Sequence, residues 1–290
     1  MSKIGFAGLG DIGLPMAMRL QEVAGPVTVW NRTAAKAENV LAQGARIASS
    51  PAALASQCHL VGICLTSDDA VDDVVFGKDG LLAAPIETTL AIVNLSTGVP
   101  QRSVDFAERA ERLGAHWVDA PVSGGVPAAS KGRLTLFLGG RDDAIATAEP
   151  LLAALGEHRT VMGAVGAGQA TKLCNQMIVA TNLLAIAEAV ATARRAGIDV
   201  ARLPQALRGG FADSAPLQVF GPRMAAHQYE PRLGAIRLML KDIEAARIMA
   251  EGAGATSPVS DFVAETYRSI EGRNLSLDVD LAALVELFEA

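Results

Sequence analysis

The sequence predicts an α/β N-terminal domain with a doubly wound, mostly parallel sheet, joined by a long helix to an all-α C-terminal domain. Short apolar runs alternate with helical patterns up to about residue 163, which is typical of a parallel sheet covered by helices. Residues 169–195 then contain neither glycine nor proline, which predicts one long helix, and only helical patterns follow it. We therefore expect two domains, residues 1–163 and 164–290.

The individual elements follow from the spacing of the apolar residues. Strand patterns fall at 4–7, 26–30, 45–47, 60–65, 90–94, 116–120, 134–139 and 160–162. Helical patterns lie between them at 12–23, 34–43, 51–56, 68–76 and 100–113. After Gly197, which ends the long helix, we expect helices at 202–208, 216–226, 233–251, 258–271 and 280–288. We expect no strand beyond Gly163.

Composition excludes several classes of protein. The 290 residues carry a formal net charge of −6, which gives no basis for a nucleic-acid partner. The three cysteines, Cys58, Cys64 and Cys174, lack metal-ligand spacing. Cys58 and Cys64 fall in an apolar run, which suggests buried thiols in a reducing compartment. The first strand pattern begins at the N-terminus, with no signal peptide, and no apolar run reaches the length of a membrane span. We expect a soluble, cytoplasmic protein that contacts no membrane.

A glycine-rich turn follows the first strand pattern. Gly8, Gly10 and Gly13 are spaced as in a dinucleotide-binding turn, between an apolar run and a helical segment. In that turn the helix N-terminus offers free N–H groups to a pyrophosphate, which predicts a Rossmann domain. The alternative is an ordinary glycine-rich turn. The candidate cofactor-binding residues here are Gly8, Leu9, Gly10, Asp11, Ile12 and Gly13.

The end of the second strand pattern indicates which dinucleotide binds. An acidic residue at this position usually binds the ribose 2′-hydroxyl, whereas a nearby arginine suits a 2′-phosphate. This chain has Asn31, Arg32 and Thr33 there, so the carboxylate is missing and a planar phosphate donor is present. The pattern favours NADP, with NAD as the second option. The alternative is that Arg32 is a solvated loop residue.

Further candidate cofactor contacts lie where two of the strand patterns end. Leu65 ends one strand, and the segment NLSTG, with Ser96 and Thr97, follows another. Ligands bind at the carboxyl ends of parallel strands, so either hydroxyl could reach a cofactor. Capping of the next helix explains either hydroxyl equally well.

The segment DAPVSGG follows another strand pattern. Ser123, Gly124 and Gly125 offer a hydroxyl and backbone N–H groups with no large side chain nearby. Such a turn is a suitable seat for a carboxylate. A flexible glycine turn is the alternative, and the position at a strand end favours the binding site.

Two lysines lie in apolar helical surroundings. Lys172 and Asn175 are three residues apart near the start of the long helix, and so lie on one face of it. Lys172 is either a catalytic group or an edge residue whose ammonium extends to water. Lys241, in LMLKDIEAA, could pair with a cofactor phosphate or a substrate carboxylate.

Taken together, these segments resemble the β-hydroxyacid dehydrogenase family, which includes 3-hydroxyisobutyrate dehydrogenase and tartronate semialdehyde reductase. The likeness covers the chain in order through GLGDIG with PMAM, NRT, NLST, DAPVSGG, GAGQATKLCN and KDIEAA. It implies a Rossmann domain, a helical C-terminal domain like that of 6-phosphogluconate dehydrogenase, and a preference for NADP. Asp11 and Ile12 depart from the usual residues of the glycine loop, but Ile12 keeps the apolar character that packing needs.

The resemblance also implies roles for individual residues. Lys172 would be the catalytic acid/base, Asn175 would lie near the substrate with Ser123, Gly124 and Gly125, and Thr97 and Lys241 would lie near the cofactor or substrate. The implied reaction moves a hydride between nicotinamide and a small carboxylate-bearing substrate. That substrate would be a 3-hydroxyacid or its semialdehyde, or a glyoxylate-type 2-oxoacid. No metal is implied.

Several alternatives stay open at this point. An imine reductase of the same fold is one, although these enzymes usually carry another residue at the position of Lys172. A non-catalytic NADP-binding module is another. The loop 209–217, with Phe211, Asp213 and Ser214, could select the substrate. The long apolar helix favours a homodimer or homotetramer.

Overall fold

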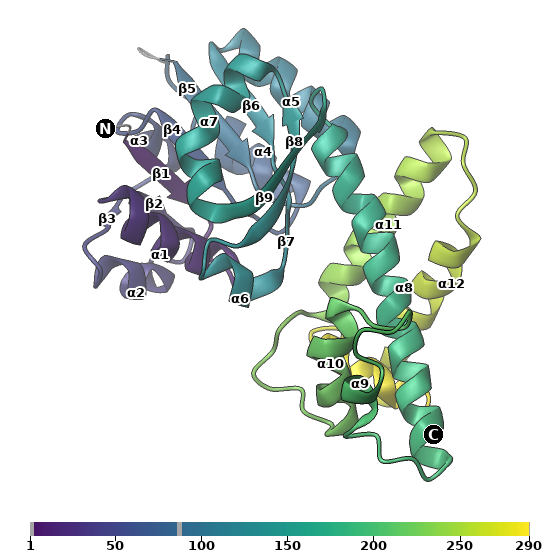
Figure 1. Cartoon of the computed structure of the whole chain (residues 1–290). Helices are drawn as coiled ribbons and strands as arrows, with labels where there is room; N and C mark the ends of the chain where they lie inside the picture. Colours follow the sequence, from purple (N-terminus) through teal and green to yellow (C-terminus); the bar gives the residue numbers. More distant parts are fainter. Residues whose placement is uncertain (1–2, 86–88, 290) are drawn as a thin grey trace. The chain divides into compact units, whose positions relative to one another are not determined.

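The structure is a computed structural model that describes residues 3–85 and 89–289. The chain forms two compact units, of which the first ends at Lys172 and the second begins at Leu173. The helix α8 (Ala167–Arg195) runs through this division (Figure 1). The first turn of α8 therefore belongs to the first unit.

The first unit is built on one sheet. Its strands are β1 (Ile4–Ala7), β2 (Thr28–Trp30), β3 (Arg46–Ile47), β4 (Leu60–Ile63), β5 (Leu90–Asn94), β6 (Ala115–Asp119), β7 (Val122–Ser123), β8 (Leu134–Gly140) and β9 (Gly156–Gly163). The order is β3-β2-β1-β4-β5-β6-β8-β7, with β9 on the other side of β8. Neighbouring strands along the part of this order that runs β3-β2-β1-β4-β5-β6 are parallel, whereas β8 runs antiparallel to β6 and β7. The order reverses between β1 and β4, where such sheets bind their ligands.

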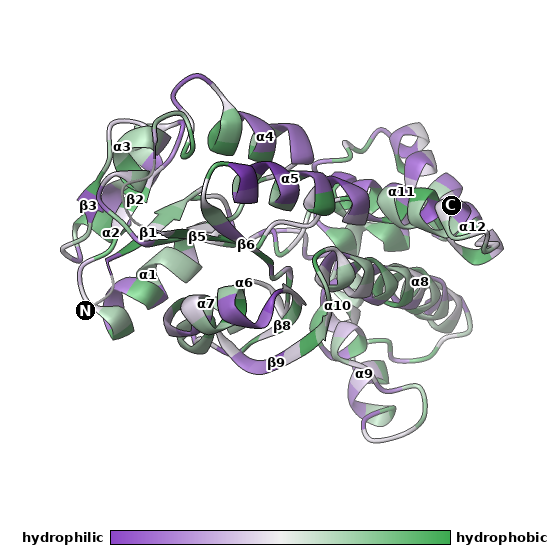
Figure 2. Ribbon diagram, turned by 90° about the horizontal axis from the view of Figure 1, so that it is seen from above, coloured by the Kyte–Doolittle hydropathy of each residue, from purple (hydrophilic) through white to green (hydrophobic). Residues whose placement is uncertain are grey.

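Helices cover both faces of this sheet (Figure 1). They are α1 (Gly13–Ala24), α2 (Glu38–Leu41), α3 (Pro51–Ala55), α4 (Asp68–Phe76), α5 (Pro100–Arg112), α6 (Gly125–Ala129) and α7 (Asp142–Leu155), with a 3₁₀ turn at Ala34–Ala37. Apolar residues of α1 and α7 pack in one core cluster and those of α4 and α5 in another. Figure 2 shows hydrophilic residues interspersed with hydrophobic ones along α5, as a helix with one buried face requires. The doubly wound, mostly parallel domain is thus confirmed.

The second unit is helical. It comprises most of α8, then α9 (Leu203–Ala206), α10 (Ala215–Ala225), α11 (Ile236–Gly252), α12 (Pro258–Arg268) and 3₁₀ turns at Ser269–Arg273 and Leu281–Leu287. Among its described residues, no strand forms, and a single isolated bridge joins Ala235 to Asp280. Its core holds Tyr267, whose hydroxyl donates to the Ala180 carbonyl at 2.9 Å and so joins α12 to α8. The all-α C-terminal domain is confirmed as well.

Some elements differ from the sequence prediction. The helix α7 was not predicted, and it contains Pro150, which usually interrupts a helix. The short β7 and α6 form where a turn was expected. The strand β9 is longer than predicted, because it pairs along β8 although most of its side chains are exposed. The domain limit near Gly163 stays a prediction, and the two compact units divide after Lys172.

The helix α8 is long and apolar enough to cross a membrane, judged by length and composition alone. The expectation that no apolar stretch reaches this length is therefore wrong for α8. The core helix of a soluble protein passes the same test, and 44% of the apolar window is buried inside the protein. Ala180, Leu183 and Ala187 pack in the core of the second unit, which accounts for the apolar character of α8.

The contact between α12 and α8 gives a test of the second unit. Replacing Tyr267 by Phe removes the donor to Ala180 but keeps the buried ring. We expect a loss of about 1 kcal/mol in the free energy of unfolding, the usual net contribution of one hydrogen bond. Tyr267→Ala, which also leaves a cavity, should cost about 3–5 kcal/mol. Urea denaturation followed by circular dichroism measures both, and an unchanged free energy of unfolding in Tyr267→Phe would contradict the assigned bond.

Candidate functional site

The glycine turn after β1 is held tightly against its neighbours. Gly8 has φ +99°, and a Cβ there would lie 2.1 Å from the carbonyl oxygen of Cys64, just after β4. A Cβ on Gly13 would lie 2.0 Å from the carbonyl oxygen of Gly8. A Cβ on Gly10 would meet nothing within 4 Å, so its backbone borders open space. The turn therefore packs on two sides and leaves one side for a ligand, as a pyrophosphate needs.

The other residues of the glycine turn differ in their burial. Leu9 is buried, and Ile12 packs against the core cluster that contains α1. Asp11 is exposed. The helix α1 begins at Gly13, directly after these residues, so its N-terminal N–H groups lie at the turn.

Asn31 braces this turn from the end of β2. The N–H of Leu9 donates to Asn31 Oδ1 at 2.8 Å, and Asn31 Nδ2 donates to the carbonyl of Thr33 at 2.8 Å. An amide can accept and donate in this way, whereas a carboxylate could only accept. Arg32 and Thr33 are exposed, and Arg32 has no partner among the residues that the structure describes. Its guanidinium is available to a phosphate.

The ends of β4 and β5 are tied to each other. The N–H of Leu65 donates to Ser96 Oγ at 2.9 Å, and the N–H of Ser96 donates to Asn94 Oδ1 at 3.0 Å. The Ser96 hydroxyl thus holds the loop after β4, and the N-cap of the next helix, α5, is Val99. Thr97 is half-buried beside it.

The three residues of the predicted carboxylate seat lie together. Ser123 ends β7 and is half-buried, Gly124 is the N-cap of α6, and α6 begins at Gly125. Both glycines have positive φ, +123° and +67°, which residues with a side chain rarely adopt. A Cβ on Gly124 would also lie 2.7 Å from the Cβ of Ala128. The backbone of this turn is therefore fixed, and the roles of its residues stay predictions.

Asp119, at the end of β6, binds the first turn of α8. Its Oδ1 accepts the N–H of Gly166 and its Oδ2 accepts the N–H of Gln169, both at 2.9 Å. The Gln169 side chain accepts the N–H of Gly98 at 3.0 Å and donates to the carbonyl of Ser96 at 2.9 Å. Burial raises the pKa of Asp119 to about 6, against the effect of the backbone donors.

Sequence reasoning missed Asp119 and Gln169 as site residues. The available signal was an acidic residue at the last position of a buried strand, because a buried carboxylate needs partners. Lys172 follows Gln169 by three residues and is only 7% exposed. That burial disfavours the alternative in which its ammonium extends to water.

In the second unit, a chain of polar contacts joins Asn175 to Lys241. Asn175 Nδ2 donates to Gln176 Oε1 at 2.9 Å, and Gln176 Nε2 donates to Asp242 Oδ2 at 2.6 Å. Lys241 Nζ lies 3.0 Å from Asp242 Oδ1. Gln176 and Asp242 are buried, and the sequence prediction overlooked both. Asn175 and Lys241 were predicted separately, and the structure links them.

The loop that was expected to select the substrate has structural contacts of its own. Asp213 accepts the N–H of Gly209 at 2.8 Å and the side-chain amide of Gln218 at 2.7 Å. These bonds, led by the one from Gly209, lower the pKa of Asp213. Ser214 caps α10. Phe211 is fully exposed, so its role stays a prediction.

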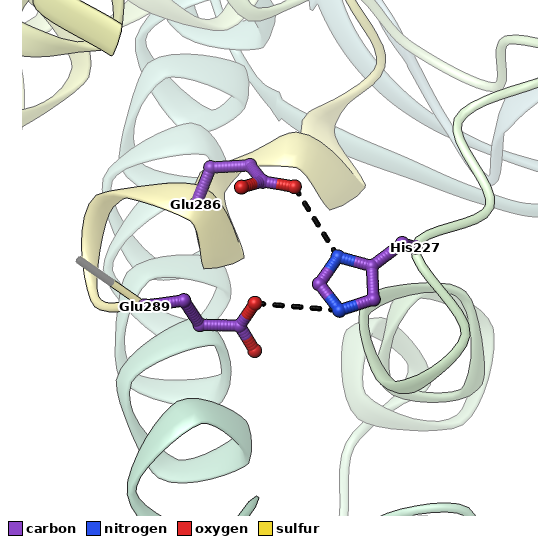
Figure 3. A group of neighbouring side chains, drawn as sticks. All are labelled: His227, Glu286 and Glu289. Atoms are coloured by element: carbon purple, nitrogen blue, oxygen red, sulfur yellow. Dashed lines mark hydrogen bonds and ion pairs between the residues drawn. The ribbon is translucent and has the colours of Figure 1, made fainter.

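One histidine has carboxylates on both sides. His227 Nδ1 lies 3.2 Å from Glu286, and Nε2 lies 3.3 Å from Glu289 (Figure 3). These three side chains could hold a metal ion by distance, since their ligand atoms lie within 4.8 Å of one another. However, the carboxylates face opposite ring nitrogens, and an ion binds one nitrogen only. A metal would need the ring to turn away from one carboxylate.

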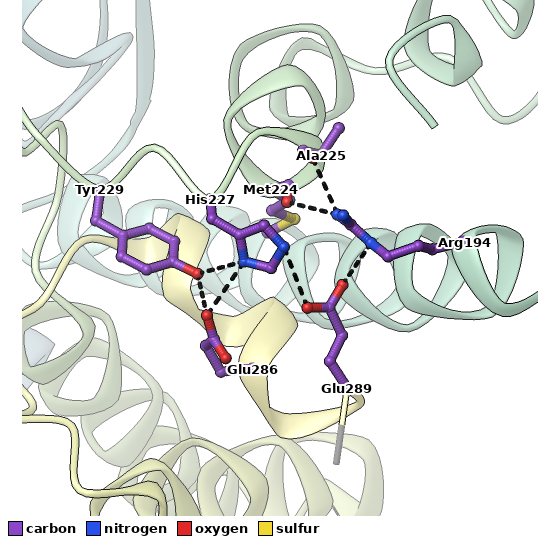
Figure 4. A network of polar contacts seen from close by, with 7 residues as sticks. All are labelled: Arg194, Met224, Ala225, His227, Tyr229, Glu286 and Glu289. Atoms are coloured by element: carbon purple, nitrogen blue, oxygen red, sulfur yellow. Dashed lines mark hydrogen bonds and ion pairs between the residues drawn. The ribbon is translucent and has the colours of Figure 1, made fainter. Parts of the chain in front are cut away.

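Further contacts extend the group of His227, Glu286 and Glu289 into a larger polar network. The Tyr229 hydroxyl donates to Glu286, which lowers the pKa of that carboxyl, and Arg194 Nε lies 2.9 Å from Glu289 (Figure 4). Arg194 also donates to two carbonyls at the end of α10, at 3.3 and 3.0 Å. The network fastens the C-terminal segment to α8 and to the chain after α10.

Comparison with known proteins covers both units. Residues 3–166 match a family model described as the NAD binding domain of 6-phosphogluconate dehydrogenase. Residues 166–288 match one described as the NAD-binding of NADP-dependent 3-hydroxyisobutyrate dehydrogenase. The 2-hydroxy-3-oxopropionate reductase of Escherichia coli (strain K12) is 33% identical over 287 residues, which cover 99% of this chain and 97% of that protein.

Solved structures agree. Psf3 in complex with NADP+ and 2-OPP has a TM-score of 0.91 at 26% identity, and the match covers 98% of this chain and 99% of that one. The 3-hydroxyisobutyrate dehydrogenase of Mycobacterium tuberculosis with L-serine has a TM-score of 0.85 at 28% identity, over 100% of both chains. With matches along both units, the chain belongs to the β-hydroxyacid dehydrogenase family and is an NAD(P)-dependent oxidoreductase that acts on CH–OH groups.

Proposed function

We propose that this enzyme transfers a hydride, with NADP(H) as cofactor, to or from a small 3-hydroxyacid or its semialdehyde, or a glyoxylate-type 2-oxoacid. The observation that carries the proposal is the buried Lys172, one helical turn beyond a residue bound to the ends of β5 and β6. Burying an ammonium costs free energy because the charge loses its hydration, so a functional role would explain its retention. Proton exchange with a substrate hydroxyl would be such a role.

NADP is the cofactor that the loop after β2 suits best. Arg32 is exposed and unpaired among the described residues, so its planar guanidinium can bind a 2′-phosphate. The Asn31 amide is engaged in bracing the turn and offers no carboxylate to a ribose. The similarity to Psf3, which was solved with NADP+, supports the same choice, and NAD remains the second option. Leu65, Thr97 and Lys241 are the further proposed cofactor contacts.

The substrate is a small molecule that carries a carboxylate. The Ser123 hydroxyl and the amides of Gly124 and Gly125 would hold this carboxylate, because their turn is fixed and free of large side chains. Asn175 lies on the same face of α8 as Lys172 and would align the reacting oxygen. The E. coli relative is named for a three-carbon hydroxy-oxo acid, which fits a site of this chemistry.

When bound, NADP(H) supplies or accepts the hydride. Lys172 would give its proton to the substrate oxygen during reduction and take it back during oxidation. We also propose a soluble, cytoplasmic homodimer or homotetramer. An imine reductase or a non-catalytic NADP-binding module is less well supported, since neither explains a buried lysine at this position.

Replacing Lys172 tests the proposed chemistry. We expect Lys172→Ala to lower kcat by about 100- to 10,000-fold, the usual contribution of a general acid/base. The affinity for NADPH should change little. NADPH oxidation with a panel of semialdehydes and glyoxylate measures the effect, and cyclic imines in the same panel test the reductase alternative. Lys78→Ala, at an exposed lysine, is the control, and near-normal turnover in folded Lys172→Ala would refute the mechanism.

Replacing Arg32 tests the cofactor. We expect Arg32→Ala to raise the KM for NADPH by about 10- to 100-fold, which is the loss of one or two charged hydrogen bonds. The KM for NADH, which lacks the phosphate, should stay the same. Arg46→Ala removes another exposed arginine, on β3, and should change neither value. An equal rise for both cofactors would show that Arg32 does not read the phosphate.

A further inference from the structure

We propose that Asp119 is the positioning residue for Lys172: its carboxylate fixes the first turn of α8, and so the place of the lysine, with Gln169 as a second attachment. This inference rests on the proposed function, in which Lys172 exchanges a proton with the substrate. It adds a residue that touches neither the substrate nor the cofactor. Such a residue acts on catalysis only through the helix that it holds.

The carboxylate makes two bonds that differ in direction. Oδ1 binds the N–H of Gly166 and Oδ2 binds the N–H of Gln169, which lie three residues apart around the first turn. Two such bonds fix the helix start in both position and rotation, whereas one bond would leave it free to turn. They also place a negative charge at the positive end of the helix dipole. Asp119 has no exposed surface, so water cannot substitute for it.

The surrounding backbone is shaped to this carboxylate. A Cβ on Gly168 would lie 2.7 Å from Asp119 Oδ2 and 2.3 Å from the carbonyl oxygen of Phe137. A Cβ on Gly139 would lie 2.7 Å from Asp119 Oδ1. Two glycines therefore allow the helix start and β8 to approach the carboxylate directly. The close fit leaves the helix start no room to shift.

Gln169 provides the second attachment, to the loop that follows β5. Its side chain binds the N–H of Gly98 and the carbonyl of Ser96, the two residues on either side of Thr97. Its own backbone N–H is bound to Asp119. The residue one turn before Lys172 is thus held by the ends of both β5 and β6. The rotation of α8 that sets the direction of Lys172 is determined by these contacts.

A double-mutant cycle tests the inference. Asp119→Asn replaces one acceptor oxygen with an NH2 group, which donates and cannot accept an N–H. We expect kcat to fall by about 10- to 100-fold, with a much smaller change in the KM for NADPH, because the glycine turn and Arg32 follow β1 and β2 and make no bond to Asp119 in the part of the chain that the structure describes. In the Lys172→Ala background, Asp119→Asn should lower the remaining rate by less than about threefold, since the residue it acts through is gone.

Asp280→Asn is a matched control. Asp280 is also buried and also accepts backbone N–H groups, from Leu233 and Ala282, but it lies in the second unit. We expect it to lower Tm and leave kcat unchanged. If Asp119→Asn fails to fold, Gln169→Met takes its place in the double-mutant cycle with Lys172→Ala. Gln169→Met removes the side-chain bonds of Gln169 and keeps its backbone bond to Asp119.

The two proposals fail in different ways. Additive losses from Asp119→Asn and Lys172→Ala would overturn the positioning role while leaving the catalytic role of Lys172 in place. A fall in kcat for Asp280→Asn as large as that for Asp119→Asn would also overturn it, because general destabilisation would then explain both. Normal turnover in Lys172→Ala alone would instead refute the proposed function.

Discussion

The carboxylate of Asp119 joins the sheet of the first unit to the helix that carries Lys172. A buried charge is tolerated only where polar groups surround it, and here backbone N–H groups of Gly166, just before α8, and of Gln169, in its first turn, supply that environment. The same contact satisfies N–H groups that every helix leaves unpaired at its start. One interaction therefore meets two needs, and it holds the turn of α8 that leads to Lys172, the proposed acid/base.

Much of the fold could be predicted because its signals are local. The period of the apolar residues predicted α4 and β5 with the bounds that the structure has, and the absence of glycine and proline predicted α8. The helix α7 was missed because Pro150 conflicts with the helical pattern, and tertiary packing against the sheet overrides that conflict. The start of β9 was missed because its side chains are mostly exposed, and only its pairing with β8 defines it as a strand.

The candidate site could be read from the sequence only in part, for a similar reason. The glycine turn, Arg32 and Lys172 belong to short segments whose chemistry can be read directly. Asp119 and Gln169 could not be found in that way, because each acts through a partner 47 to 73 residues away. The same holds for Asp242, which meets Gln176 across 66 residues. The sequence next to such residues does not reveal their contacts, because the contacts form only when distant segments come together in the fold.

The amide of Asn31 has a consequence for how the cofactor preference of such an enzyme can change. An aspartate at this position would supply the carboxylate that a ribose hydroxyl prefers, and it could still accept the N–H of Leu9. It would lose the bond to the Thr33 carbonyl, because a carboxylate has no proton to donate. A switch toward NAD by this route would therefore loosen the segment that carries Arg32. The residue at position 31 would therefore affect both the cofactor preference and the rigidity of this loop.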